Sequence, residues 1–266
     1  MAQQQISIRM HKQECRDGWL AVMGTEEALR SSRPLVVMLH GALRHSGVLA
    51  GWVAQLEPRF GVLLVDLPGH GRSPPCGTAS VRSFAENIGD ALEPFIRNRP
   101  TLVVGESLGG LIALALGGIN PPSVKGVIAA DPPLTTAKLW HVVDALKSAK
   151  AAYPDNRFIQ EFARNIFGVG DGGEAIERNY YPILGDLRIP GLVMTGDLPL
   201  FPRRAVNGTP CLLDDVDRWV IETVFSDKVT LTQVPGSGHL LLTDAQHACL
   251  QLIGQFYDSL MKPAVQ

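Results

Sequence analysis

The chain is short of aromatic residues and carries no excess of charge of either sign. Only 6% of its 266 residues are aromatic, and 24 basic residues stand against 26 acidic ones. The formal net charge of -2 gives no electrostatic footprint for a nucleic acid or an anionic membrane, and no basic patch is interleaved with aromatic residues. We therefore expect neither a nucleic acid nor a membrane as a partner.

Cysteine pairs and long apolar runs are missing as well. The cysteines are widely scattered, with no C-x-x-C pair, and no histidines cluster at metal-ligand spacing, which predicts free thiols and no metal site. The four cysteines are Cys15, Cys76, Cys211 and Cys249. The N-terminal residues lack the basic and apolar regions of a secretory signal, and no apolar run approaches the roughly 20 residues that span a bilayer. A soluble cytoplasmic protein is the resulting expectation.

The chain does have a regular alternation of short β-branched runs with longer helical patterns. This alternation is typical of repeated βαβ units and a mostly parallel sheet, and 45% hydrophobic content fits one α/β domain with an insertion. An antiparallel hairpin and six further strands are predicted at Ile6–His11, Leu20–Met23, Leu35–Leu39, Val62–Asp66, Thr101–Val104, Val124–Ala130, Gly191–Thr195 and Val229–Val234. Helices are predicted at Gly47–Leu56, Val81–Ile96, Ser107–Gly117, Asp214–Phe225 and Thr243–Met261.

One connection is too long to be a simple crossover between neighbouring strands. It contains three segments of helical periodicity, at Thr136–Ala152, Arg157–Phe167 and Glu174–Leu184. We predict that residues 132–188 form a small helical cap after the sixth strand, and that residues 1–131 and 189–266 form the core. Such a cap would cover the carboxyl edge of the sheet, where open α/β sheets keep their ligand sites.

The most informative segment is the pentapeptide Gly105-Glu106-Ser107-Leu108-Gly109. Its apolar and small-residue flanks predict a buried strand, a sharp turn and a helix, with one hydroxyl at the apex. A serine hydroxyl is a poor nucleophile, so it must project toward a base while a backbone N–H is ready for the oxyanion. Leu108 opens the helix. Its N–H therefore has no partner within the helix and lies at the positive end of the helix dipole. Ser107 is the predicted nucleophile, and Leu108 is a predicted oxyanion donor.

The serine needs an imidazole base, and the imidazole needs a carboxylate that fixes its tautomer. His239 follows the last predicted strand in a glycine-rich loop, at the same sheet edge as Ser107, and is the predicted base. Asp197 follows the seventh predicted strand after one glycine, in the chain order serine, acid, histidine. Asp131, at the end of the preceding strand, could approach the same imidazole. We favour Asp197 over Asp131 as the acid.

The second oxyanion donor should come from the loop after the third predicted strand, which turns at His40-Gly41-Ala42. We predict the Ala42 N–H, with Leu43 as the alternative if the loop is displaced by one residue. His40 and His70 both precede glycines in tight turns. We expect these two histidines to hydrogen-bond within their loops and to shape them.

Several segments together resemble the α/β-hydrolase superfamily. The segments that follow the order and spacing of that family's motifs are His40-Gly41, Asp66-Leu67-Pro68-Gly69-His70-Gly71-Arg72-Ser73, Gly105-Glu106-Ser107-Leu108-Gly109-Gly110 and Gly236-Ser237-Gly238-His239. The resemblance covers nearly the whole chain and implies an eight-stranded, mostly parallel sheet with a cap domain, in a cofactor-free serine hydrolase. It implies Ser107 as nucleophile, His239 as base, and Ala42 and Leu108 as oxyanion donors.

The chain departs from the family at the acid, because many members place the carboxylate three residues after the strand-ending glycine. Here that position is Pro199, and the acid nearby is Asp197, directly after Gly196. The assignment of Asp197 therefore rests on its place in the chain order and not on the family's spacing.

The resemblance also narrows the range of reactions that we expect of this protein. Serine at the elbow argues against the haloalkane dehalogenase and epoxide hydrolase branches, which need a carboxylate nucleophile. We expect hydrolysis of a small to medium, largely uncharged carboxylic ester through an acyl-enzyme, unless Arg44, Arg203 or Arg204 faces the pocket. A thioesterase, an acyltransferase, a lyase or a carbon–carbon bond hydrolase could use the same residues, and a small-ligand receptor is the rival from another class. The sequence leaves the oligomeric state open.

Overall fold

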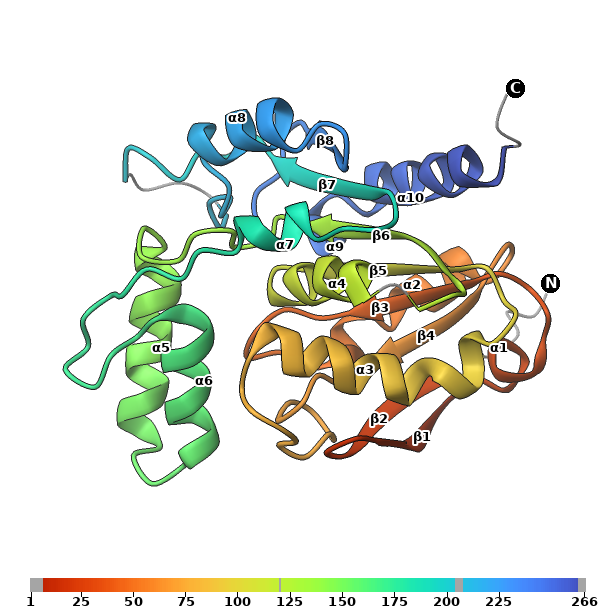
Figure 1. Ribbon diagram of the computed structural model, residues 1–266, viewed down its shortest axis with the longest axis horizontal. Helices are drawn as coiled ribbons and strands as arrows, with labels where there is room; N and C mark the ends of the chain where they lie inside the picture. Colours follow the sequence, from red (N-terminus) through yellow and green to blue (C-terminus); the bar gives the residue numbers. More distant parts are fainter. Residues whose placement is uncertain (1–6, 120, 204–207, 263–266) are drawn as a thin grey trace.

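Eight strands form one sheet in the computed structural model, which describes residues 7–119, 121–203 and 208–262 (Figure 1). The strands are β1 (Ile8–Cys15), β2 (Gly18–Thr25), β3 (Leu35–Leu39), β4 (Gly61–Val65), β5 (Thr101–Glu106), β6 (Val124–Ala130), β7 (Gly191–Gly196) and β8 (Val229–Val234). Their order is β1-β2-β4-β3-β5-β6-β7-β8. β1 and β2 pair antiparallel, and the strands from β4 to β8 run parallel. The predicted eight-stranded, mostly parallel sheet is confirmed.

Helices cover both faces of this sheet. They are α1 (Glu26–Arg30), the 3₁₀ helix η1 (Ser46–Leu49), α2 (Gly51–Leu56), α3 (Val81–Ile96), α4 (Leu108–Ile119), α5 (Trp140–Ala152), α6 (Arg157–Phe167), α7 (Tyr181–Gly185), α8 (Asp215–Val224), α9 (Leu241–Asp244) and α10 (Gln246–Met261). Along β3, Val37 packs into the apolar layer of α3 and α4, whereas Val36 and Met38 pack into the layer of α2 and α10. Because both faces are covered, β3 is buried along its whole length. Among the described residues, no helix combines the length and hydropathy needed to cross a membrane.

The ends of the chain depart from the predicted elements in two places. The last helix, predicted as one element, is interrupted at Ala245 and forms α9 and α10. The first strand was predicted to start at Ile6, which lies outside the described residues, and it extends to Cys15. The hairpin itself is present as predicted, with β1 and β2 paired along their whole lengths.

The third helix of the segment between β6 and β7 is mostly absent. It was predicted at Glu174–Leu184, but only its last residues are helical, in α7. Pro182 lies in the first turn of α7, and proline cannot continue a helix from upstream because it has no N–H to donate. Upstream of it residues 174–180 form no helix, and Asn179 forms an antiparallel bridge with Thr135.

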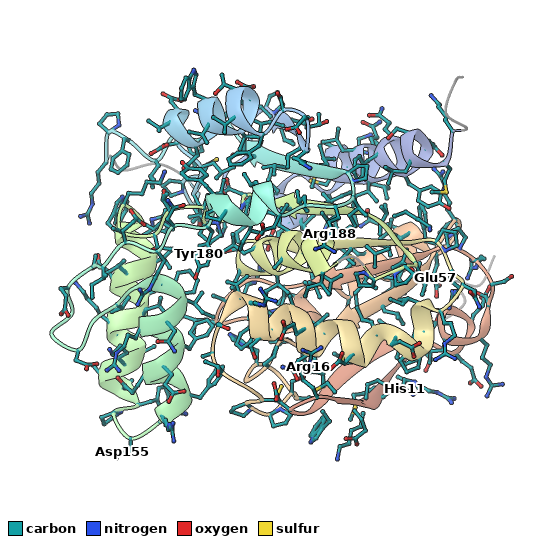
Figure 2. The ribbon with its side chains drawn as sticks, in the orientation of Figure 1. His11, Arg16, Glu57, Asp155, Tyr180 and Arg188 are labelled. Atoms are coloured by element: carbon teal, nitrogen blue, oxygen red, sulfur yellow. The ribbon has the colours of Figure 1, made fainter. Side chains whose placement is uncertain are left out.

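The insertion, residues 132–190, joins β6 to β7 and carries α5, α6 and α7. In Figure 1, α5 and α6 lie side by side at one end of the molecule. Phe158 and Phe162 of α6 pack on the ring of His70, with centroids 6.1 and 5.1 Å from it. Tyr180, labelled in Figure 2, donates its hydroxyl to a backbone carbonyl of α6 at 2.8 Å. The division of the chain into a core and a cap stays a prediction.

Parallel strands bring their carboxyl ends to one edge of the sheet. The loops that follow β3, β5, β6, β7 and β8 therefore converge on a single region. These loops contain Gly41, Ser107, Asp131, Asp197 and His239, in that order along the chain.

Candidate active site

Ser107 occupies the turn between β5 and α4 in a strained backbone conformation. Its φ is +58°, in the left-handed region that residues with a side chain avoid. A Cβ on Gly105 would lie only 2.0 Å from the carbonyl oxygen of Gly109, so the turn closes only with glycine at this position. The N–H of Ser107 donates to the carbonyl of Ala130 at 2.8 Å. The expected strand-turn-helix is present, and it is tied to the end of β6.

The loop after β3 lies directly against Ser107. A Cβ on Gly41 would lie 3.2 Å from the Cβ of Ser107 and 3.8 Å from its Oγ. Nε2 of His40 accepts the N–H of Leu67 at 3.1 Å, so the ring proton is on Nδ1, which donates to the carbonyl of Gly41 at 2.7 Å. Burial lowers the pKa of His40 to about 4. His40 therefore shapes this loop as a neutral ring.

Two backbone N–H groups belong to the turns that meet at the serine. Ala42 directly follows Gly41, and Leu108 is the first residue of α4. The first N–H of a helix has no acceptor within that helix, and it lies at the positive end of the dipole. The role of these two groups as oxyanion donors stays a prediction, which this placement favours.

His239 pairs with Asp131. Nδ1 of His239 lies 2.7 Å from Oδ2 of Asp131, and the aspartate is fully buried. The carboxylate also accepts the hydroxyl of Thr195 at 2.9 Å and the N–H of Leu212 at 2.7 Å. Because Nδ1 donates to the carboxylate, Nε2 is the ring nitrogen left to take up a proton.

Asp131 also connects this base to the serine turn. It follows Ala130, whose carbonyl accepts the N–H of Ser107, and its own N–H donates to the carbonyl of Met194 at 2.7 Å. Its φ is +48°, so the chain leaves the extended conformation of β6 at this residue. Asp131 thus lies between the serine turn and the loop that holds His239, and Ser107 itself is only 7% exposed.

The prediction that Asp197 partners His239 is wrong in this structure. Asp197 is exposed, and both of its carboxylate oxygens lie 3.0 Å from the N–H of Gly236, which donates to them. The N–H groups of Asp197 and Leu198 both donate to the carbonyl of Ser237. The chain leaving β7 is therefore held along the histidine loop, so that the carboxylate of Asp197 caps the loop's backbone and does not reach the imidazole.

Glu106 is a further buried acid, for which the sequence predicted no role. Its Oε2 accepts Nη1 of Arg44 at 2.6 Å, and its Oε1 accepts the N–H of Leu242 at 3.0 Å. Arg44 belongs to the loop after β3, and Leu242 follows His239. Burial raises the pKa of Glu106, although the charges of His239 and Arg44 act in the opposite direction. Glu106 therefore joins the two loops that flank Ser107.

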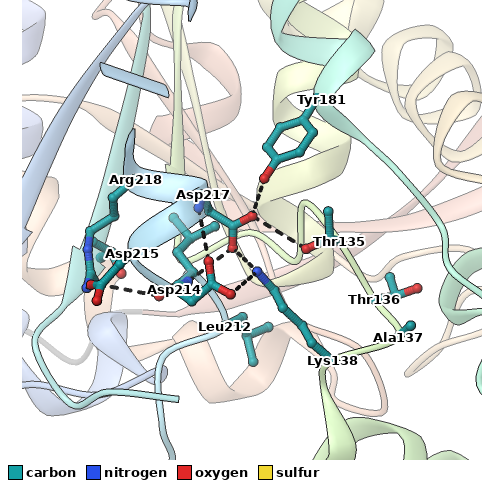
Figure 3. A network of polar contacts seen from close by, with 12 residues as sticks. Thr135, Thr136, Ala137, Lys138, Tyr181, Leu212, Asp214, Asp215, Asp217 and Arg218 are labelled. Carbon is teal, nitrogen blue, oxygen red and sulfur yellow. Dashed lines mark hydrogen bonds and ion pairs between the residues drawn. The ribbon is translucent and has the colours of Figure 1, made fainter. Parts of the chain in front are cut away.

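A second polar network holds the backbone around Leu212 (Figure 3). Lys138 forms ion pairs with Asp217 and, at 2.8 Å, with Asp214. Tyr181 donates its hydroxyl to Asp217 at 2.5 Å. Lys138 and Tyr181 come from the insertion, whereas the two aspartates lie at the start of α8, just after Leu212. The network links the insertion to the segment that hydrogen-bonds to the buried acid.

The groups gathered at this edge are a hydroxyl, an imidazole, a carboxylate and the backbone N–H groups of Ala42 and Leu108. Within the described part of the chain, no three His, Cys, Asp or Glu side chains lie together as metal ligands. The structure thus brings a serine on a strained turn to the same sheet edge as an imidazole that a carboxylate orients, and acyl transfer uses these three groups.

Comparison with known proteins agrees with this geometry. The model of a family described as "Alpha/beta hydrolase family" matches residues 36–252. The chain belongs to the alpha/beta hydrolase family. The matched residues include Ser107, Asp131 and His239 and extend from β3 into α10.

Curated relatives within this family are similar over part of their length. A pimeloyl-[acyl-carrier protein] methyl ester esterase from Chromobacterium violaceum is 42% identical over 120 residues, which is 44% of this chain and 45% of the relative. A protein of the same name from Methylococcus capsulatus is 33% identical over 115 residues, or 42% of this chain and 43% of the relative. The chain therefore spans less than half the length of these relatives.

Solved structures are similar over almost the whole chain. The naproxen esterase (carboxylesterase NP) of Bacillus subtilis has a TM-score of 0.66 and 17% sequence identity, and the match covers 95% of this chain and 92% of that one. At this identity the likeness shows the fold alone, which is the α/β-hydrolase fold predicted from the motifs.

Proposed function

We propose that this protein is a serine hydrolase that cleaves a small to medium carboxylic ester through an acyl-enzyme. The observation that carries the proposal is the 2.7 Å contact between Nδ1 of His239 and Asp131, at the same edge of the sheet as a serine in a strained left-handed turn. A carboxylate on Nδ1 holds the tautomer whose Nε2 can accept the serine proton, and it stabilises the imidazolium that forms.

In the proposed reaction, Oγ of Ser107 attacks the ester carbonyl carbon while Nε2 of His239 takes the hydroxyl proton. The carbonyl oxygen becomes an oxyanion, which accepts the N–H groups of Ala42 and Leu108. The bond to the alcohol then breaks, and the imidazolium returns its proton to the departing alcohol. Water, deprotonated by His239, attacks the acyl-enzyme and releases the carboxylic acid and the free serine.

Two observations support an uncharged ester as the reacting group. The relatives described above are named as esterases. Arg44, which would favour an anionic substrate if its charge faced the site, is paired with Glu106 at 2.6 Å. The pair adds no net charge beside Ser107, so we propose a small-molecule acyl substrate whose scissile group is neutral.

Release of p-nitrophenol from short-chain p-nitrophenyl esters tests the proposal. We expect a burst of one equivalent per active site, labelling of Ser107 by a fluorophosphonate, and loss of both in Ser107→Ala. Ser226→Ala, at an exposed serine before β8, is the matched control and should keep both. An unreactive Ser107 together with tight binding of a small ligand would overturn the proposal in favour of a receptor. The rates of cleavage of a panel of esters, thioesters and β-diketones then show which type of bond the protein cleaves fastest.

We also propose that α5 and α6 act as a cap over this site. The packing of Phe158 and Phe162 on His70 supports this role, because it places α6 on the loop after β4. Deletion of the two helices should raise the labelling rate of Ser107 by bulky fluorophosphonates. The cytoplasmic location stays a prediction, which cell fractionation tests.

A further inference from the structure

Two neighbouring side chains at the start of α5 hold polar nitrogens away from water. Nε1 of Trp140 and both ring nitrogens of His141 are buried, and no described residue hydrogen-bonds to them. The two rings meet edge to face, with centroids 5.0 Å apart. Buried polar groups in folded proteins nearly always have a partner, because desolvation without one costs free energy. These nitrogens therefore point to a polar group that they bind.

Trp140 packs on a cluster that contains a hydrogen-bond partner of the buried acid. This apolar cluster consists of Leu139, Leu200 and Leu212. The backbone N–H of Leu212 donates to Asp131 at 2.7 Å. The cluster on which Trp140 packs thus includes a residue whose backbone N–H binds the carboxylate of the catalytic pair.

His141 lies close enough to the same pair to be affected by its charges. Its pKa is lowered, first by burial and then by His239, while Asp131 acts in the opposite direction. Together with the packing of Trp140, this places the two residues in the part of the insertion that lies near the catalytic pair.

The donor set defines what these residues can bind. The indole N–H of tryptophan is only a donor, and a neutral imidazole supplies one donor and one acceptor. The guanidinium of Arg203 lies over the indole ring, 3.9 Å from its centroid, and a cation–π contact of this kind fixes the ring plane and adds positive potential. Two N–H donors beside a cation match an oxygen acceptor of the carbonyl type.

We propose that Trp140 and His141 form an oxygen-binding subsite for a second carbonyl group on the acyl part of the ester. The substrate class is therefore an acyl ester with a further keto, ester or carboxyl group along its chain, not a simple alkanoate. This inference rests on the proposed function and refines it, because the scissile ester stays neutral while a distal oxygen determines selectivity.

Binding to Ser107→Ala tests the subsite separately from catalysis. Isothermal titration would compare methyl alkanoates with the dimethyl and monomethyl esters of dicarboxylic acids, each at acyl lengths from four to eight carbons. At one length we expect a diester or monoester to bind at least about tenfold more tightly than the alkanoate, as one or two well-placed hydrogen bonds allow. Preference for the monomethyl ester would identify the oxygen as a carboxylate, and preference for the dimethyl ester as a neutral carbonyl.

The same titrations in the Ser107→Ala background assign the preference to these residues. Trp140→Phe and His141→Phe should each reduce it to about twofold or less, because they keep the ring and remove the nitrogens. Trp219→Phe and His247→Phe, at exposed positions on α8 and α10, are the matched controls and should retain it. Circular dichroism melting confirms that each variant folds.

Two results would overturn the subsite. One is the absence of any chain length at which the second carbonyl improves binding, and the other is a preference that survives both Trp140→Phe and His141→Phe. Failure of the proposed function looks different, because then the wild-type protein would show no burst and no labelling of Ser107 even though Ser107→Ala selects the dicarbonyl ester.

Discussion

The ends of β6 and β7 carry the same residue at the same edge of the sheet and use it differently. Asp131 is fully buried and accepts hydrogen bonds from Thr195, Leu212 and His239. Asp197 is exposed and accepts the N–H of Gly236. A position directly after a parallel strand is therefore not what makes an acid available to the histidine.

The chain that follows each aspartate accounts for the difference. After β6 it departs at a positive φ into the insertion, and a distant segment returns to donate the N–H of Leu212 to Asp131. After β7 it runs along the histidine loop and hydrogen-bonds to the carbonyl of Ser237. A carboxylate surrounded by donors is held in one orientation, which is what the partner of an imidazole requires.

The largest effect should come from replacing the carboxylate at the end of β6 with a neutral amide. We expect Asp131→Asn to lower kcat by on the order of 10³–10⁴-fold, because an amide at Nδ1 favours the wrong tautomer of His239. Asp197→Asn is the control and should change kcat less than about threefold. Steady-state hydrolysis of p-nitrophenyl acetate measures both, and the opposite ranking would return the role to Asp197.

The next largest effect is on the stability of the folded protein at low pH, which sets the pH range over which the two aspartates can be compared. The pKa of His40 falls from 6.5 to about 4, mainly through burial, so the unfolded chain binds the proton more readily between these values. Stability should therefore fall as the pH drops from about 6.5 to about 4, by about 3 kcal/mol from this residue. Urea unfolding at several pH values measures it. His40→Gln should lose this part of the pH dependence, and an unchanged profile would contradict the assignment.

A third carboxylate, that of Glu106, allows the effect of negative charge near His239 to be separated from the effect of a hydrogen bond that orients its ring. Burial raises the pKa of Glu106 and the charge of His239 acts against this effect, but the hydrogen bonds of Glu106 go to Arg44 and Leu242. Glu106→Gln keeps the shape and loses the charge-assisted bond to Arg44, so we expect a loss of about tenfold in kcat. Single-turnover kinetics with p-nitrophenyl esters measures it. A loss as large as that of Asp131→Asn would mean that negative charge near the imidazole matters more than its position.

The smallest effect should come from a residue of β7 that serves the acid of β6. Thr195→Val removes the hydroxyl that donates to Asp131 at 2.9 Å, and we expect about a three- to tenfold loss in kcat, equivalent to roughly 1 kcal/mol. Thr230→Val, at an exposed position of β8, should leave kcat unchanged. Equal rates in the two variants would show that Asp131 does not need this hydrogen bond.

The parts of the site that were predictable from sequence are local. Gly105 and Gly109 flank Ser107 between a strand and a helix pattern, and His239 lies in a glycine-rich loop directly after a strand. The acid is not local, because Thr195 and Leu212 are 64 and 81 positions from Asp131. No periodicity indicates which distant N–H groups turn toward a carboxylate.

Two residues in the sequence indicate features that the predicted elements and site do not include. Glu106 is a charged residue between an apolar strand and the serine, and a charge buried there requires a partner, which is Arg44. Pro182 lies inside the helix predicted at Glu174–Leu184 and excludes most of it. The sheet was easier to predict, because short continuous apolar runs such as β3 are typical of strands covered on both faces.

The hydrogen bonds of Figure 3 have a consequence for engineering. Lys138 and Tyr181 travel with the insertion, while Asp217, which they bind, travels with α8. A chimera that borrowed the insertion alone from another family member would leave Asp217 buried without its cation and loosen the backbone at Leu212. Grafts meant to change acyl selectivity should therefore exchange the insertion and the start of α8 together.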